Sequence, residues 1–155
     1  RLWRPMKARR DRSADAHGRV GIQALSAALQ RCQAQHALQP EALHVISDAD
    51  HRASRTAELY EALTEVAAGV DPMLAVTRVG QSCGDLGVAG ALVPVVLASA
   101  MAREAAADAA PPAQAPLYLA ALVQSTHERV VLPLAPWGRA VSPTQAPAAE
   151  SALAT

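Results

Sequence analysis

The hydrophobic pattern of this chain centres on residues 79–101, whose sequence is VGQSCGDLGVAGALVPVVLASAM. No charged residue occurs between residues 86 and 101, so the pattern predicts a helix that is apolar around its circumference and covered on every side. It is too short to span a membrane comfortably. Pro94 is expected to kink this helix or to shift its start. A structural glycine loop, which allows close backbone approach, leads into it: Gly84, Gly87 and Gly90.

The remaining apolar positions predict an alternation of helices and strands. Helical spacing predicts two amphipathic helices, over residues 22–36 and 54–67. Shorter apolar runs predict strands over residues 43–47, 74–79, 117–123 and 130–134. The last two flank a polar turn at His127 and Glu128, which predicts a β-hairpin. This order predicts an α/β fold with a mixed, mostly parallel sheet of the five-stranded type, amphipathic helices on one face and the buried apolar helix on the other.

The chain of 155 residues is expected to form one domain with flanking segments. Residues 1–19 are basic and interrupted by proline and glycine, which predicts an extended arm whose Leu2 and Trp3 could end a strand. Residues 20–136 carry the periodic pattern and form the predicted domain. Residues 137–155 are rich in proline, alanine, serine and threonine, which predicts a disordered tail.

Composition and charge narrow the function classes. The net charge is +0, which argues against non-specific nucleic-acid binding by the chain as a whole, although the arm carries seven basic residues against two acidic ones. Aromatic residues make up only 3% and phenylalanine is absent, so the core is expected to consist of alanine, leucine and valine. Cys32 and Cys83 lack metal-ligand spacing and fit a reducing compartment. We therefore predict a cytoplasmic protein without a metal or cofactor.

Two short segments carry a resemblance to a known family. Val45-Ile46-Ser47-Asp48 ends a predicted strand, and Gly84-Asp85-Leu86-Gly87-Val88-Ala89-Gly90 enters the apolar helix. Together with the order of elements, they resemble the C-terminal half of β-ketoacyl synthases, which have the thiolase fold. The first segment lies where the synthases carry a histidine loop of the type HGTGT, and the second is similar to their GHxxxAAG segment with one residue fewer. The resemblance covers roughly residues 19–136 and implies a thiolase-like half.

The departures from the family pattern bear on catalysis. The synthases use a cysteine from their N-terminal half and two histidines, or histidine and asparagine, from their C-terminal half. Here Ser47 or Asp48 lies at the first histidine position and Asp85 at the second. A carboxylate has the wrong charge for stabilising a developing oxyanion. The resemblance therefore implies a catalytically degenerate protein of the kind associated with type VI secretion effectors, acting as an adaptor in effector loading.

Two other function classes stay open. The chain could be a subunit or fragment of an acyl-condensing enzyme whose nucleophile lies on a separate N-terminal half. A nucleic-acid-binding module using the basic arm has only the arm's charge in its favour. Cys83 could be a stabilised thiolate near a helix start, but no base lies next to it in sequence, and a small buried cysteine is the favoured interpretation. His36 is expected to be a partly buried, hydrogen-bonded histidine, and His127 part of a solvated turn.

Acidic residues after the strands offer a further candidate site. Four side chains could gather at the carboxyl ends of parallel strands as a metal or acid–base cluster: Asp48, Asp50, His51 and Asp85. We favour the alternative in which Asp48 and Asp50 cap turns and Asp85 caps the apolar helix.

The apolar helix also predicts an interface. One sheet covers only one side of a helix, so the other side would expose a contiguous apolar surface, which monomeric proteins rarely do. The predicted interface residues are Leu92, Val95, Val96 and Ser99. The resemblance implies the partner: a second thiolase-like half, on another chain or upstream, with an equivalent helix packed back to back across a pseudo-twofold axis. No membrane contact is expected.

Overall fold

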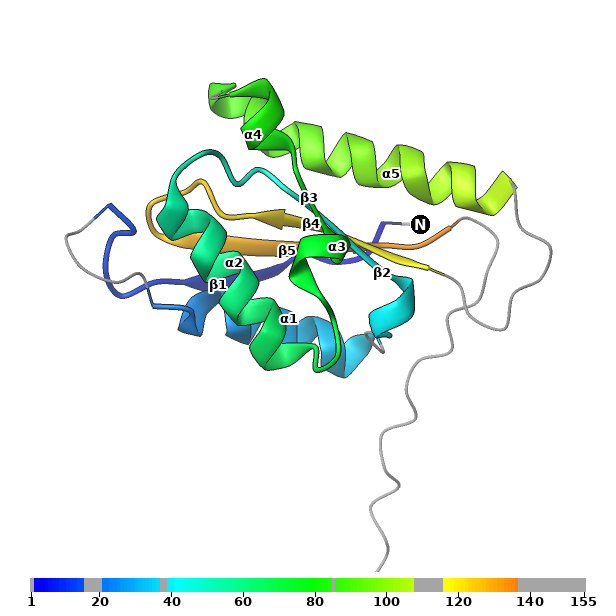
Figure 1. The fold of residues 1–155 in the computed structure, drawn as a ribbon, viewed down its shortest axis with the longest axis horizontal. Coiled ribbons are helices and arrows are strands. Elements are labelled where there is room, and N and C mark those ends of the chain that lie inside the picture. Colours follow the sequence, from blue (N-terminus) through cyan, green and yellow to red (C-terminus); the bar gives the residue numbers. More distant parts are fainter. Residues whose placement is uncertain (1, 16–20, 37–38, 85, 108–115, 137–155) are drawn as a thin grey trace, which may run out of the picture.

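The computed structural model describes residues 2–15, 21–36, 39–84, 86–107 and 116–136. It has one five-stranded sheet with helices on both faces (Figure 1). The strands are β1 Met6–Arg9, β2 Leu43–Ser47, β3 Val76–Arg78, β4 Leu117–Leu122 and β5 Glu128–Leu134. Their order across the sheet is β1-β5-β4-β2-β3. The predicted disordered tail, residues 137–155, lies outside the described residues.

The sheet is mixed, as predicted, but it is not mostly parallel. β2 pairs in parallel with β3 and β4, whereas β5 pairs antiparallel with both β4 and β1. The additional antiparallel pairing comes from the basic arm, because Met6 pairs with Val131 and Arg9 with Glu128 at the edge of the sheet. Further upstream, the Trp3 amide donates to the Pro133 carbonyl oxygen at 3.2 Å.

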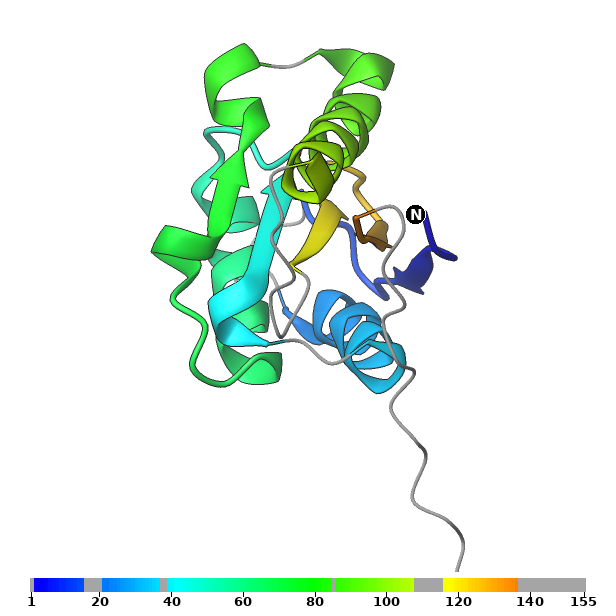
Figure 2. The same ribbon diagram turned by 90° about the vertical axis from the view of Figure 1, so that its right-hand side faces the viewer.

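Two helices cover one face of the sheet (Figure 1 and Figure 2). They are α1 Gln23–Gln35 and α2 Ala53–Val66, and each bound lies one residue from the predicted one. Their inward side chains, among them Leu25, Leu29, Leu59 and Leu63, belong to one buried core with strand residues such as Val45, Leu119 and Val131. The alternation of apolar and polar positions at 3.6-residue spacing therefore predicted this layer correctly.

Four short helical elements join the larger ones: η1 Pro40–Ala42, α3 Pro72–Ala75, α4 Val79–Cys83 and η2 Gly87–Ala91. The predicted strand over residues 74–79 is therefore too long. Only Val76–Arg78 is a strand, because α3 precedes it and α4 follows at once. The side chain of Asp71 caps α3 by accepting a hydrogen bond from the Met73 amide at 2.9 Å.

The apolar helix, α5 Leu92–Ala107, covers the opposite face of the sheet. The helix begins later than predicted, at Leu92, and Pro94 lies in its first turn. Ala98 and Ala102 are buried against sheet residues such as Ile46 and Ala120. The prediction of a buried helix is thus correct only for this sheet-facing side.

The outward side of α5 has no cover from the described residues. The prediction that the apolar stretch is too short to span a membrane was wrong as to length, because the helix continues to Ala107. Among the described residues, one helical stretch, Ala89–Ala107, is long and apolar enough to cross a membrane by length and composition, and 17% of it is buried. Core helices of soluble proteins pass the same test, so this is weak evidence for a membrane span. The packing of Ala98 and Ala102 on the sheet is consistent with a soluble protein.

Candidate functional site

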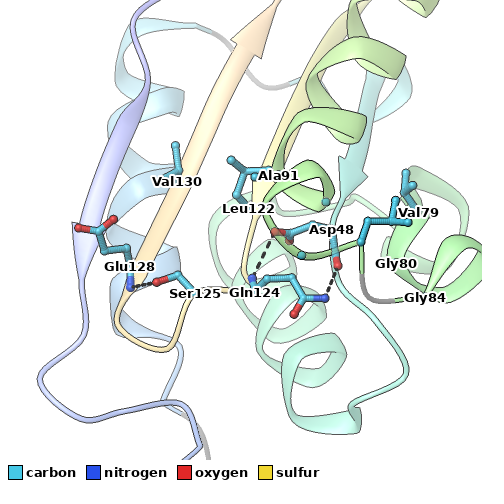
Figure 3. A pocket seen from close by; sticks show the side chains of 13 residues that line it. Asp48, Val79, Gly80, Gly84, Ala91, Leu122, Gln124, Ser125, Glu128 and Val130 are labelled. Carbon is cyan, nitrogen blue, oxygen red and sulfur yellow. Dashed lines mark hydrogen bonds between the residues drawn. The ribbon is translucent and has the colours of Figure 1, made fainter.

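The topology leaves a crevice at the carboxyl ends of the parallel strands. The chain leaves β2 toward α2 on one face and leaves β3 toward α5 on the other, and open α/β sheets bind ligands at such divergence points. A pocket of about 250 Å³ lies here (Figure 3). It is lined by Asp48, Val79, Gly80, Gly84, Leu86, Gly87, Gly90, Ala91, Leu122, Gln124, Ser125, Glu128 and Val130.

Asp48 joins the end of β2 to the segment that follows β4. One carboxylate oxygen accepts a hydrogen bond from the Val123 amide at 2.6 Å, and the other accepts from the Gln124 amide at 3.3 Å. The Gln124 side chain in turn donates to the Asp48 carbonyl oxygen at 2.9 Å. Burial raises the pKa of Asp48 to about 6, although these two backbone amides favour the carboxylate.

The Ser47 side chain is likewise hydrogen-bonded to the protein backbone. Its hydroxyl donates to the Ala121 carbonyl oxygen at 2.8 Å and accepts from the Ala49 amide at 3.1 Å. Both Ser47 and Asp48 are buried. At the position where the resemblance places the first synthase histidine, these side chains therefore hold β2 and β4 together.

The glycines near the pocket have distinct roles. Gly84 and Gly87 adopt φ angles of 71° and 56°, a left-handed conformation that side chains disfavour. Gly80, which sequence reasoning did not single out, allows the closest approach, because a Cβ there would lie 2.4 Å from the Asp48 carbonyl oxygen and 2.8 Å from that of Ala49. At Gly90 a Cβ would make only an ordinary contact, 3.8 Å from Leu86 Cβ.

The described members of the predicted acidic cluster, Asp48, Asp50 and His51, do not gather into a group that could hold a metal ion. Asp50 is held by Arg52, whose side-chain Nε lies 2.8 Å from one carboxylate oxygen and whose backbone amide donates to the other at 3.0 Å. Burial would raise the pKa of Asp50, but these hydrogen bonds outweigh it and lower the pKa to about 2. His51 is exposed. Among the described residues, no group of three His, Cys, Asp or Glu side chains could hold a metal ion.

Asp85 lies outside the described residues. Its predicted roles, as a degenerate active-site position and as the cap of the apolar helix, therefore stay predictions. Asp50 does bond its own turn through the Arg52 amide, as the capping interpretation expected, whereas Asp48 bonds across to the segment after β4.

Two predictions about the cysteine and histidine side chains were wrong. Cys83 was expected to be buried but is exposed, and Cys32 is the buried one. His36 is buried against the Trp3 ring at a centroid distance of 4.2 Å, but its Nε2 has no hydrogen-bond partner among the described residues. His127 is exposed in the hairpin turn, with Nδ1 2.9 Å from the Thr126 hydroxyl, as predicted.

A buried ion-pair network, which the sequence pattern did not reveal, supports the pocket. The Glu58 carboxylate receives two hydrogen bonds from Arg129, both at 2.8 Å, and one from Arg10 at 2.9 Å. Arg129 also donates to the carbonyl oxygens of Ser125 at 2.6 Å and Glu128 at 2.7 Å. Because Ser125 and Glu128 line the pocket, this network fixes one of its walls.

The outward side of α5 is a second candidate surface. Leu92 is 63% exposed and Val96 is 66% exposed. Val95 and Ser99, also predicted as interface residues, are only partly buried, and Val95 packs against the core on the sheet side. Leu92 and Val96 are thus the most prominent members of the predicted interface.

No family model, curated protein or solved structure matches this chain. The structure alone shows the α/β class and the mixed open sheet. The thiolase-like relationship stays a prediction from the two sequence segments and the order of elements.

Proposed function

We propose that this chain is a non-catalytic protein-interaction module that docks onto a second α/β unit through the outward side of α5. The observation that carries the proposal is the exposure of Leu92 and Val96, 63% and 66%, on a helix without a charged residue between positions 92 and 102. The two side chains are four residues apart and so lie on one helix face. Fully burying a leucine or valine side chain stabilises by about 1.5–3 kcal/mol.

The proposed occupant is a second thiolase-like half with an equivalent apolar helix. Ala100 is exposed one turn beyond Val96, and small residues let two helices approach at about 8–10 Å. The exposed charges of Arg103 and Glu104 follow the apolar stripe, which would then give the interface a polar border. The resemblance to the synthases supplies the symmetric arrangement of the two halves. In such an assembly the chain would act as an adaptor, for which a type VI secretion effector is the cargo that the resemblance implies.

The chemistry around Asp48 supports a role without catalysis. Oxyanion stabilisation needs hydrogen-bond donors aimed at the reacting carbonyl, whereas the Asp48 carboxylate accepts hydrogen bonds from the amides of Val123 and Gln124. Cys83 is exposed at the end of α4. The acyl-condensing alternative would take its nucleophile from a separate N-terminal half.

Site-specific photocrosslinking tests the proposed docking face. A photoreactive amino acid replaces Val96 in the native host, and a matched control replaces Gln30, which is exposed on α1 at the opposite face. We expect one dominant crosslinked protein from position 96, with an α/β sequence pattern and its own apolar helix, and none from position 30. Crosslinks to lipid, the same products from both positions, or no product from position 96 would refute the proposal.

A further inference from the structure

The pocket at the carboxyl ends of β2 and β4 has an unusual set of charges. Among the described residues that line it, the charged side chains are Asp48 and Glu128, both acidic. The other described lining residues are apolar, apart from the glycines and two neutral polar side chains, Gln124 and Ser125. Asp48 is buried and Glu128 is exposed, and in Figure 3 the Glu128 carboxylate points away from Asp48. Asp48 therefore supplies the buried carboxylate of the pocket.

We propose that this pocket binds a small alkylammonium ligand, whose ammonium group is held by the Asp48 carboxylate while its short alkyl chain lies against the apolar walls. Leu86, Ala91, Leu122 and Val130 supply those walls. The proposal concerns a different surface from the docking face of α5 and does not depend on the proposed function.

Asp48 has acceptor capacity left for such a ligand. Each of its oxygens accepts one backbone hydrogen bond, from Val123 or Gln124, and a carboxylate offers about four lone-pair positions in all. Arg129, the nearby cation, is engaged by Glu58 through two hydrogen bonds. Among the described residues no cation forms an ion pair with Asp48, and a buried carboxylate without such a partner is costly. An ammonium group that donates to Asp48 would form a charge-assisted hydrogen bond there.

The shape and charge of the pocket define the ligand further. Its volume of about 250 Å³ lies just below the range of about 300–1,000 Å³ that is typical of ligand sites, which favours a ligand with only a few carbon atoms. The close approach of Gly80 to the Asp48 backbone brings α4 against the end of β2. Carboxylates and phosphates are disfavoured, because the buried Asp48 carboxylate would repel a second negative charge.

The proposal is tested by titrating the full chain with n-butylammonium near neutral pH and measuring the amide chemical shifts. The neutral n-butanol and the anionic n-butyrate serve as probes of similar length. We expect n-butylammonium to bind at least about tenfold more tightly than n-butanol, and n-butyrate not to bind. The shifts should concentrate at Asp48, Gln124 and Ala91.

Two variants locate the site and its charge. Ala91→Leu fills the pocket from an exposed position on η2 and should weaken n-butylammonium binding about tenfold. The control Ala57→Leu, exposed on α2 at the opposite face of the sheet, should leave it unchanged. Asp48→Asn should reduce the affinity for n-butylammonium to that for n-butanol. If Asp48→Asn does not fold, the wild-type comparison of the three probes still tests the charge preference. Equal affinities for these probes, no binding, or binding that Ala91→Leu leaves unchanged would overturn the proposal.

Discussion

Replacing Glu58 by glutamine should destabilise this protein far more than a helix-surface substitution would. Glu58 accepts hydrogen bonds from both Arg10 and Arg129, and the side chains of Glu58 and Arg129 are fully buried while that of Arg10 is 7% exposed. Glutamine keeps the size of the side chain but removes its charge, and its amide nitrogen would face an arginine donor. Two buried guanidinium groups would then lack their carboxylate.

The magnitude follows from the burial of the network. Breaking a buried ion pair by removing one partner costs about 3–5 kcal/mol, a large part of the roughly 5–15 kcal/mol by which domains are stable. For a domain of this size, each kcal/mol lowers the melting temperature by about 2–4 °C. Glu58→Gln should therefore lower it by about 6–20 °C.

Chemical denaturation monitored by circular dichroism measures the loss of free energy of unfolding, and thermal unfolding measures the shift of the melting temperature. The control is Glu65→Gln on the same helix, because Glu65 is exposed and its hydrogen bond from the Ser26 hydroxyl can be kept by glutamine. It should cost less than about 0.5 kcal/mol. A loss below about 1 kcal/mol for Glu58→Gln would show that the network is not a buried charge cluster.

Three further predictions concern the pocket and the thiols. Gly80→Ala should destabilise the fold by about 1–3 kcal/mol in denaturant titrations, because its Cβ would meet the Asp48 carbonyl oxygen at 2.4 Å; an unchanged midpoint would contradict the close packing of α4. Carboxyl NMR titrations should give a pKa of about 6 for Asp48 and about 2 for Asp50, both against an ordinary 3.8. Asp48 therefore contributes stability below pH 3.8 that is lost as the pH rises through about 6. The contribution of Asp50 is instead present above pH 3.8 and lost as the pH falls through about 2. Coincident titrations of the two carboxyl groups would contradict these environments. A thiol reagent should modify the exposed Cys83 in the native protein and reach Cys32, whose pKa burial raises to about 12, only on unfolding; rapid modification of both would show that Cys32 is accessible.

Local periodicity predicted those elements whose pattern is long or clearly bounded. The amphipathic helices α1 and α2, the strand β2 and the β4–β5 hairpin lie close to their predicted positions. β1 was missed because its alternation covers only four residues, with Met6 buried and Lys7 and Arg9 exposed, inside a segment dominated by charge. Its partner β5 lies more than a hundred residues away in sequence, so no local pattern could predict the pairing.

One part of the ion-pair network, the inward position of Glu58, could be predicted from helical spacing. Arg55, Glu58, Leu59 and Ala62 follow helical spacing in α2 and are all buried, so the two charged residues lie on the inward face together with the apolar ones. The spacing alone could not identify Arg10 and Arg129 as partners of Glu58, because both come from distant strand segments. Likewise, Asp48 was predicted to cap its own turn, but it bonds to an amide 75 residues later in the chain.

The proposed docking face and the proposed ligand pocket are adjacent, and this has a thermodynamic consequence. Leu86 and Ala91 line the pocket, and Leu92, the first residue of α5, directly follows Ala91 in the chain. A partner that buries Leu92 would therefore lie beside the pocket opening and contact or order the η2 segment. If the partner prefers one arrangement of η2 and the ligand prefers the same one, each would raise the affinity for the other by the same factor, because coupling free energies are reciprocal. A partner that blocks the opening would instead make the two binding events exclusive. Measuring ligand affinity with and without the partner would thus decide whether Asp48 belongs to a regulated site or to an independent one.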